Sequence, residues 1–454
     1  MLGLKKKVIR GKKEGKTASF HRFGIGKKGA GVLQAFDTLN CSCRDGKLRG
    51  GVGLKTYVDA YGNRTTILMP AGDFAEAHVA TSKNGLTESK QVYVVGKDGY
   101  LYLRNPKSMQ IEKKLFVGPS VDHLAMRMET GEIKNLFSGT ADVAMTTDGT
   151  SFSNRLWDGM RGSCILKGRY ILARYNGEIR YSAVFSPFEE SSPDPDGSGT
   201  IYLPAGYGEV VGMKEYGGEA YIFCEKGIFR LTVSAKASDF TLKNVPYKGG
   251  SICLRSMAIS EKGIVFLANE GAYCVNGDFV KRICEHLPIG PCDHNQLCAT
   301  AYGTGFFIIE YTQKKSTTSE KKRLVIDADC EDGFFAELYG MLGGNEYTLM
   351  SSNLCVFTKD ETNVKRGQLP YYTSVPLDFG TRKTKRLKKL RLKGSGEVIV
   401  IMKCGAAAHS YVAIFQNGET EIPLWDKGKT VTFTFQMKPW SCLESVEVDY
   451  TVEE

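Results

Sequence analysis

The residues that most often carry metal or nucleophile chemistry are dispersed along this chain. The six histidines are His21, His78, His123, His286, His294 and His409. No two of them are four residues apart and no His-Glu-x-x-His sequence occurs, so a zinc site on one face of a helix is not indicated. Cys292 and His294 lie close together but are too few to form a ligand set. We therefore expect no bound metal and no cofactor.

The thirteen cysteines follow no regular spacing. They are Cys41, Cys43, Cys164, Cys224, Cys253, Cys274, Cys284, Cys292, Cys298, Cys330, Cys355, Cys404 and Cys442. Their count is odd, no Cys-x-x-Cys pair occurs, and most of them lie within apolar runs. This pattern favours reduced thiols in a core over a disulfide framework or a structural zinc site.

Three loops resemble parts of known functional motifs. Gly24 to Gly29 contains glycines and lysines but lacks the spacing and the hydroxyl residue of a phosphate-binding loop. Asp194 to Gly199 resembles the start of a calcium loop but has no downstream glutamate at the required distance. Thr147 to Thr150 is similar to the aspartate-box turns of sialidases, without the full Ser-x-Asp-x-Gly-x-x-Trp sequence. Because no Gly-x-Ser-x-Gly occurs either, we predict that the chain is not an enzyme.

Positive charge is concentrated in two segments of a chain whose formal net charge is +10. In the first segment, the candidates for contact with DNA or acidic partners are Lys5, Lys6, Lys7, Arg10, Lys12 and Lys13. In the second, where leucines alternate with the charges, they are Arg382, Lys383, Lys385, Arg386, Lys388 and Lys389. Such clusters bind phosphates without reading base sequence. For free DNA as the main partner, we prefer the simpler interpretation of a solvated tail and a lysine-protected edge strand.

Short runs of aromatic and β-branched residues, separated by glycine turns, fill the middle of the chain. One example is Ala220 to Cys224, which turns at Gly227 into Ile228 to Leu231. This pattern is typical of antiparallel hairpins. The 51 glycines against only 14 prolines fit many tight turns in a β protein.

The hairpins recur at intervals of about 40 to 50 residues, the length of a propeller blade. Near Pro370 the pattern changes, and roughly five alternating strands follow in the remaining residues. We predict an all-β fold with a basic arm at residues 1–20, a β-propeller-like domain at residues 21–370 and a C-terminal β-sandwich at residues 371–454.

Part of this pattern resembles a known protein family. The relevant segments are Ile179 to Ser182, a loop rich in proline and aspartate, Ile201 to Leu203, Val210 to Met213, Tyr221 to Phe223, Gly227 to Leu231, Ser256 to Ala258 and Gly263 to Tyr273. In this order they are similar to the propeller segment of tail nozzle and packaged-DNA stabilisation proteins of tailed bacteriophages. Phe379 to Leu392 is similar to the sandwich that follows in those proteins.

The resemblance implies a virion structural protein of the head-tail or tail nozzle region. Such a protein forms a homo-oligomeric ring that extends the DNA channel and helps to retain packaged DNA. The implied partners are portal or adaptor proteins and other tail proteins, with non-specific contact to packaged double-stranded DNA. Since no long apolar stretch occurs, we expect no membrane contact and synthesis in a cytoplasm. The resemblance implies that this is the cytoplasm of a host bacterium and that the final location is the virion tail.

Two other functions are compatible with a propeller. A glycan-binding propeller presents aromatic and acidic side chains from loops at one face, and Tyr207, Tyr216 and Tyr247 are candidates for this role. A glycoside hydrolase requires a paired acid and nucleophile, and no such pair is distinguished in the sequence.

Overall fold

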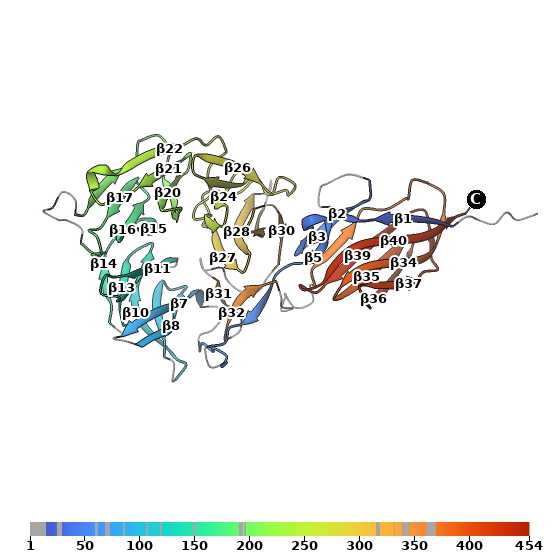
Figure 1. Ribbon diagram of the computed structural model, residues 1–454, viewed down its shortest axis with the longest axis horizontal. Helices are drawn as coiled ribbons and strands as arrows, with labels where there is room; N and C mark the ends of the chain where they lie inside the picture. The colour runs from blue at the N-terminus through green and yellow to red at the C-terminus, as the bar shows by residue number, and fades with distance from the viewer. Residues whose placement is uncertain are drawn as a thin grey trace, which may run out of the picture. The chain divides into compact units, whose positions relative to one another are not determined.

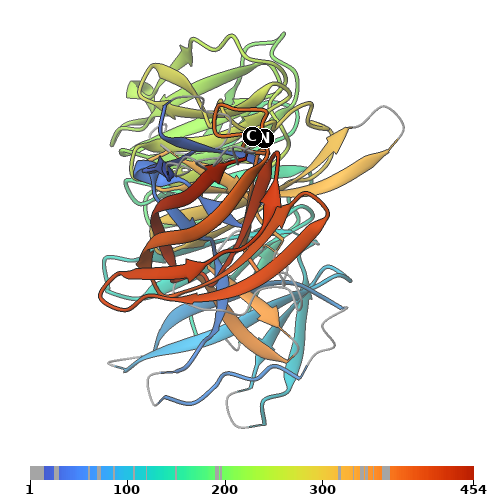
Figure 2. The ribbon, with the colours of Figure 1, turned by 90° about the vertical axis from the view of Figure 1, so that its right-hand side faces the viewer.

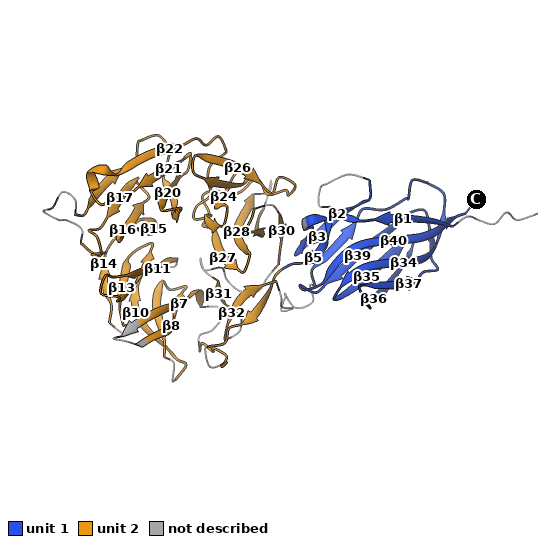
Figure 3. Ribbon diagram, in the orientation of Figure 1, with its two compact units in different colours: residues 1–51, 366–454 blue, residues 52–365 orange. Residues whose placement is uncertain are grey.

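The computed structural model describes residues 15–24, 30–59, 62–68, 73–84, 87–105, 108–118, 120–148, 151–189, 194, 197–314, 318–330, 332–337, 342, 346–350, 352–359 and 369–453. The chain divides into two compact units, Val52–Lys365 and the combination of Met1–Gly51 with Arg366–Glu454 (Figure 3). Apart from 3-10 turns at Arg44–Gly46 and Ala237–Asp239, the regular elements of the described residues are β-strands. The middle of the chain therefore folds as one unit and its two ends share the other.

The unit of residues 52–365 contains five four-stranded antiparallel sheets, each built from consecutive strands (Figure 1). The first two contain β7 (Phe74–Asn84), β8 (Thr87–Gly96), β9 (Tyr100–Arg104) and β10 (Ile111–Phe116), then β11 (Val121–Arg127), β12 (Ile133–Gly139), β13 (Val143–Thr146) and β14 (Ser153–Arg155). The third and fourth contain β15 (Met160–Leu166), β16 (Arg169–Arg174), β17 (Glu178–Tyr181) and β18 (Gly199–Tyr202), then β19 (Val210–Tyr216), β20 (Glu219–Cys224), β21 (Gly227–Thr232) and β22 (Thr241–Val245). The fifth contains β23 (Ala258–Ser260), β24 (Gly263–Ala268), β25 (Gly271–Asn276) and β26 (Phe279–Ile283).

Two further blades share one seven-stranded sheet. The four-strand pattern is repeated by β27 (Ala299–Gly303), β28 (Phe306–Lys314), β29 (Ser319–Asp327) and β30 (Gly333–Phe335). The last blade contains β31 (Tyr347–Met350), β32 (Asn353–Thr358) and, from the start of the unit, β6 (Gly53–Thr56). Because β31 contacts β7, the last blade lies beside the first. The described residues thus form a closed β-propeller of seven blades.

The predicted all-β class, with a propeller and a β-sandwich, is confirmed. The first strands of the blades begin at Phe74, Val121, Met160, Val210, Ala258, Ala299 and Tyr347, which reproduces the expected spacing of about 40 to 50 residues. The sequence pattern did not indicate β7 or β10. Both carry lysine and glutamate among short apolar runs, and only their place in a blade makes them strands.

The second unit is a sandwich of two sheets, and the red arrows of Figure 2 belong to its C-terminal strands. One sheet has the order β37 (Glu419–Pro423), β34 (Lys385–Ser395), β40 (Cys442–Val452), β5 (Leu48–Gly50) and β4 (Cys41–Ser42), with β38 (Lys427–Gly428) on β34 and β1 (Lys16–Phe20) on β40. The other has the order β2 (Arg22–Gly24), β3 (Val32–Leu39), β33 (Tyr371–Ser374), β39 (Val431–Met437), β35 (Glu397–Cys404) and β36 (Ala407–Ile414).

The domain boundaries differ from the predicted ones at the N-terminal side. Residues 21–51, expected in the propeller, belong to the sandwich, and so do residues 16–20 of the expected arm. The reason is pairing between segments far apart in sequence, since Lys16 lies opposite Tyr450 and Leu39 opposite Tyr371. The propeller is therefore an insertion within the sandwich.

The sandwich core follows from strict alternation along its strands. In β39, Val431, Phe433, Phe435 and Met437 are buried while the residues between them are half-buried. They pack in one cluster with leucines of β34, including Leu390 from the facing sheet. Each such side chain contributes about 1.5 to 3 kcal/mol when fully buried, so the period of two fixes which face of each strand points inward.

Candidate binding cavity in the propeller

A cavity of about 330 Å³ lies within the propeller unit. It is lined mainly by residues at or just before the beginnings of the first strands of six blades, from β7 to β27. Its charged lining residues are Glu76, Asp122, Arg161, Lys214, Arg255, Glu310 and Lys321. A volume of this size is within the range of small-ligand sites.

Local irregularities in three blades shape this cavity. The pairing register shifts between Phe74 and Glu76, between Met160 and Gly162, and between Val210 and Gly212. A β-bulge at such a place twists the strand and redirects a side chain. In the third blade the bulged residue is Arg161, which lines the cavity.

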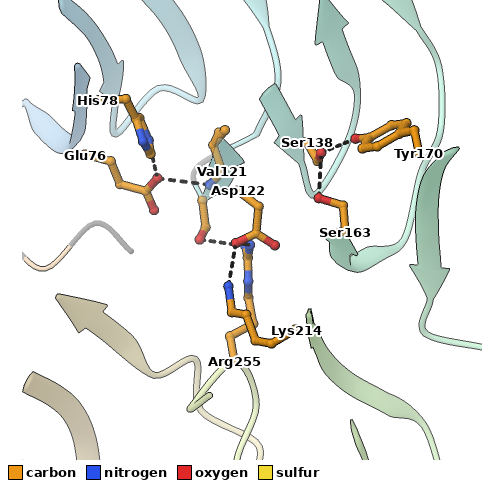
Figure 4. Close-up of polar contacts among 10 residues, drawn as sticks. Glu76, His78, Val121, Asp122, Ser138, Ser163, Tyr170, Lys214 and Arg255 are labelled. Carbon is orange, nitrogen blue, oxygen red and sulfur yellow. Dashed lines mark hydrogen bonds and ion pairs between the residues drawn. The ribbon is translucent and has the colours of Figure 1, made fainter. Parts of the chain in front are cut away.

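Asp122 is the centre of an ionic cluster in the cavity wall (Figure 4). Its Oδ1 atom lies 3.3 Å from Nζ of Lys214 and 3.2 Å from Nη2 of Arg255. Nη1 of Arg255 donates a hydrogen bond of 2.7 Å to Oγ of Ser120. Three blades thus contribute charges to one point, and two cations share one carboxylate.

Electrostatics in this cluster favour the charged forms. Burial by itself would raise the pKa of Asp122, but the ammonium of Lys214 and the guanidinium of Arg255 outweigh this effect and lower that pKa. For Lys214, burial opposes protonation, but the carboxylate of Asp122 prevails and raises its pKa. Asp122 and Lys214 are therefore ionised at neutral pH.

Glu76 and His78 on β7 form a second polar group beside the cluster (Figure 4). The carboxylate of Glu76 accepts a hydrogen bond of 3.0 Å from the backbone N–H of Val121 and lies 3.3 Å from Nε2 of His78. His123 stacks on Phe137 at a centroid distance of 4.8 Å. Burial, and secondarily His78, lower the pKa of His123 to about 4, so its imidazole is neutral at neutral pH.

Hydroxyl groups link the second and third blades farther along the same region (Figure 4). Oγ of Ser138 lies 3.0 Å from Oγ of Ser163 and also contacts the hydroxyl of Tyr170. Burial raises the pKa of Tyr170, so its hydroxyl stays protonated and serves to satisfy the two serines. We see this group as structural.

The basic residues identified in the sequence are found in different environments. Lys5, Lys6, Lys7, Arg10, Lys12 and Lys13 lie outside the described residues. The second cluster forms β34 and the bend before it, where Arg382, Lys383, Arg386 and Lys388 are exposed. The predicted edge strand is wrong, because β34 pairs with β37 and β38 on one side and with β40 on the other.

Acidic strands on both sides neutralise part of this cluster. Nζ of Lys389 lies 2.8 Å from Glu421 of β37. Arg391 contacts the same carboxylate at 3.2 Å and also Glu447 and Asp449 of β40, at 3.1 Å and 2.5 Å. The positive charge that is conspicuous in the sequence is thus largely balanced within the sheet at these two positions.

Lys385 was expected at a contact surface and is buried instead, with a relative exposure of 1%. Its ammonium donates hydrogen bonds to the backbone carbonyls of Thr381, Lys383 and Lys429 at 2.5, 3.0 and 2.5 Å. A buried cation requires such acceptors. Lys385 therefore fastens the bend at the start of β34 and is not available to a partner.

Other residues noted in the sequence have local roles. All thirteen cysteines are free, and ten of them are buried. Tyr207 packs against Phe229 at 4.8 Å, and the hydroxyls of Tyr216 and Tyr247 donate to the carbonyls of Glu261 and Gly250. These three tyrosines are half-buried and do not converge on the cavity. The loop Asp194 to Gly199 and the turn Thr147 to Thr150 extend beyond the described residues.

Within the described ranges, no group of three or more His, Cys, Asp or Glu side chains is arranged to hold a metal ion. In the same part of the chain, no helix has the length and apolar character needed to cross a membrane.

Sequence reasoning missed the cluster of Asp122, Lys214 and Arg255. These residues are separated by tens of positions and belong to no motif. The only sequence signal is a charged residue within or next to the apolar run that forms a first strand, as for Lys214 after Val210 to Met213. That signal acquires meaning only when the blades are arranged around a ring.

Comparison with protein-family models finds no match, and no curated protein matches the chain. Among solved structures, the chain is similar to virginiamycin B lyase from Staphylococcus aureus, with a TM-score of 0.42 and 11% identity over 68% of this chain and 99% of that one. It is also similar to the β-propeller domain of Cps50 (Swd1) from Myceliophteria thermophila, with a TM-score of 0.39 and 10% identity over 65% and 98% of the two chains. For BBS1N, solved in complex with ARL6DN, the TM-score is 0.40 and the identity 7% over 66% and 100%. With such low scores, these likenesses carry no information about function.

Proposed function

We propose that this chain is a bacteriophage virion structural protein of the head-tail or tail nozzle region. In this proposal it forms a ring that extends the DNA channel and helps to retain packaged DNA. The observation that carries the assembly part is an unprotected strand at the edge of the sandwich, β36. The position in a phage tail rests on the resemblance of the blade and sandwich segments to nozzle proteins.

Strand β36 pairs with β35 and ends its sheet. Its sequence, Ala407–Ile414, contains no proline, lysine, arginine or acidic residue. Val412 and Ile414 are 60% and 64% exposed. Natural proteins usually protect an exposed edge with charges or proline, because free backbone groups recruit other strands. An edge without these devices is suited to pairing with another chain.

The uncharged surface continues from this edge across the sheet. Val412 lies opposite Ile399 of β35, which in turn lies opposite Gln436 of β39. In β35 the alternate residues Val398 and Val400 are in the core, so Ile399 is on the outer face. The outer face beside β36 is therefore uncharged along this row, and the charged residues of β35 on the same face, Glu397 and Lys403, lie nearer its ends.

A second copy of the chain is the occupant that we propose for this edge. Each copy has a formal net charge of +10, so copies repel one another through most of their surface. Contact at an uncharged strip avoids this repulsion and covers the free edge. A ring forms only when β36 of one copy contacts a different surface of the next copy, because pairing of β36 with β36 would stop at a dimer. The exposed Arg382, Lys383, Arg386 and Lys388 are then available to acidic neighbours or to DNA phosphates.

The test is size-exclusion chromatography with light scattering, together with negative-stain electron microscopy, on the protein alone and mixed with portal or adaptor rings. We expect rings, or a monomer that joins those rings as a ring. A protein that remains monomeric and ignores these partners would contradict the proposal.

A variant pair locates the contact. Val412→Lys places a charge on the free edge, and we expect it to abolish ring formation without unfolding the sandwich. The matched control is Phe279→Lys on β26 of the propeller, where the side chain is 83% exposed. Rings formed equally well by both variants would show that β36 is not the contact, even if the ring itself exists.

A further inference from the structure

The cationic side chains that line the propeller cavity have more hydrogen-bond donors than the neighbouring carboxylates accept. Lys214 and Arg255 both point to Oδ1 of Asp122 (Figure 4). Glu310 also has two cationic partners but contacts them through different oxygens, Lys321 through Oε1 at 3.2 Å and Arg323 through Oε2 at 2.7 Å. An ammonium has three hydrogen-bond donors and a guanidinium has five. Because Lys214 and Arg255 share one oxygen of Asp122, some of their donors remain available to a ligand in the cavity.

Arg161 is a further cation that lines the same cavity. Its Nε atom is buried and has no hydrogen-bond partner among the described residues. Its nearest acid is Glu209, at 3.6 Å from Nη2, and that carboxylate is 56% exposed. A buried guanidinium N–H without an acceptor costs free energy. A bound acceptor would remove this cost.

The backbone conformation also positions the side chains of Arg255 and Arg161, and at Arg255 this conformation is strained. Arg255 has a φ of 54°, in the left-handed region that residues with a Cβ rarely adopt. Its N–H donates to the carbonyl of Val211 at 2.8 Å, which fixes this conformation. Arg161 occupies a β-bulge. Backbone strain and β-bulges are over-represented next to functional sites, where they direct side chains.

We propose that this cavity binds a small ligand through one oxyanion, a carboxylate or a phosphate. Lys214, Arg255 and Arg161 hold the oxyanion, and Leu297, which is 49% exposed, contacts the remainder of the ligand. Cationic donors in a partly enclosed site bind carboxylates and phosphates through charge-assisted hydrogen bonds. The site is independent of the ring proposed above, since its residues all belong to the propeller.

Isothermal titration calorimetry on the full chain tests this site. The probes are glucuronate, glucose 6-phosphate and inorganic phosphate at constant ionic strength, with glucose as the neutral control. We expect saturable binding of at least one oxyanion and none of glucose. Glucuronate alone would assign the site to carboxylates, and either phosphate alone would assign it to phosphates. Equal binding of glucose, or no saturable binding of any oxyanion at concentrations up to about 10 mM, would overturn the proposal.

Variants separate a binding role from a structural one. Lys214→Met and Arg161→Met should each weaken oxyanion binding by about tenfold or more, because each removes a charged hydrogen-bond donor. Arg127→Met is the matched control, since Arg127 is 62% exposed near the end of β11 and does not line the cavity. Unchanged binding in both cavity variants would contradict the assignment.

Asp122→Asn provides a test with the opposite sign. It removes the internal carboxylate that competes for Lys214 and Arg255, so oxyanion binding should become several-fold tighter. A residue with only a structural role would weaken binding or leave it unchanged when replaced. Weaker binding by this variant, with its fold intact by circular dichroism, would overturn the proposal.

Discussion

The propeller and the sandwich differ in how their strands are completed. In the propeller, β6 from the beginning of the unit completes the last blade on β32, and β31 lies against β7. In the sandwich, β36 ends its sheet with an exposed apolar strand. The ring of blades is closed within one chain, although the outermost strands of the blades still end their sheets. In the sandwich, the backbone groups along the free side of β36 can pair with another chain. The two proposals accordingly assign ligand binding to the first unit and assembly to the second.

The ion pairs of the two units also differ in their exposure to solvent. In the propeller, Asp122, Lys214 and Arg255 meet in a cavity wall with side-chain exposures of 14%, 20% and 11%. In the sandwich, Arg391 and its acidic partners lie on an outer face, and the arginine side chain is 38% exposed. Water screens the second group far more than the first. Ion pairs of the same residue types therefore contribute differently to the free energy of unfolding in the two units.

The largest effect is expected for Leu54→Ala in β6, the strand that completes the last blade of the propeller. Leu54 is fully buried and packs in one cluster with Phe357 and Phe306. Loss of its side chain leaves a cavity in the last blade, and we expect a loss of about 2 to 5 kcal/mol in the free energy of unfolding. Chemical denaturation measures it. Val412→Ala on the open edge should change the same quantity by less than about 0.5 kcal/mol, and equal effects would remove the distinction between closed and open edges.

Asp122→Asn is the corresponding test for charge. It leaves two cations in the cavity wall without their shared carboxylate, and we expect a loss of about 3 kcal/mol, at the low end for a broken buried pair because some solvent reaches the group. The pKa of Asp122 is lowered, so its contribution is present above the unfolded value near 3.8 and is lost as the pH falls through the folded value. Urea denaturation of Asp449→Asn, on the outer face of the sandwich, is the comparison, and a larger loss there would reverse the argument.

His123 gives the propeller a dependence on mildly acidic pH. Its folded pKa is about 4 and its ordinary value is 6.5. Between these values the unfolded chain binds a proton that the folded propeller does not, so stability falls as the pH decreases from 6.5 towards 4. We expect the urea midpoint of His123→Gln to fall less steeply over this range than that of the wild type. His21→Gln, at an exposed position in the sandwich, should follow the wild-type slope, and a wild-type slope for His123→Gln as well would exclude His123 as the cause.

The smallest effect is expected for Arg391→Met. Its ion pairs with Glu421, Glu447 and Asp449 are on the outer face of β34 and its neighbours. Such exposed pairs add little to stability, and salt weakens them. The melting temperature should change only slightly, and less at high salt than at low salt. A large, salt-independent decrease would show that this network holds the sandwich together.

The sequence predicted the strands with strong alternation and sharp turns most accurately. The hairpin from Ala220 to Leu231 corresponds to β20 and β21, and Tyr371 to Ser374 is β33. Strands with mixed polarity, such as β7 and β10, had no comparable pattern. The N-terminal boundary was also wrong, because residues 16–51 pair with strands more than 300 positions later, as Lys16 does with Tyr450.

For the candidate site, the residues that stand out in the sequence are not the ones that the structure brings together. The basic segment from Arg382 to Lys389 stands out in the sequence, yet Lys385 is buried and Lys389 is paired with Glu421. The cavity cluster does not stand out at all, because its members are single charges in separate blades. A local pattern reports the charge of a segment, but not what lies opposite that segment in the fold.

The sequence by itself determined the all-β class, the blade repeat and the change of pattern near residue 370. These follow from short-range physics, since side chains alternate across a strand and glycine permits tight turns. Only the tertiary structure decided that both ends of the chain build one sandwich, that β6 closes the ring, and that Asp122, Lys214 and Arg255 meet. Those facts depend on contacts between segments far apart in the chain, and the free energy of such contacts is a property of the assembled sheets rather than of any single stretch of sequence.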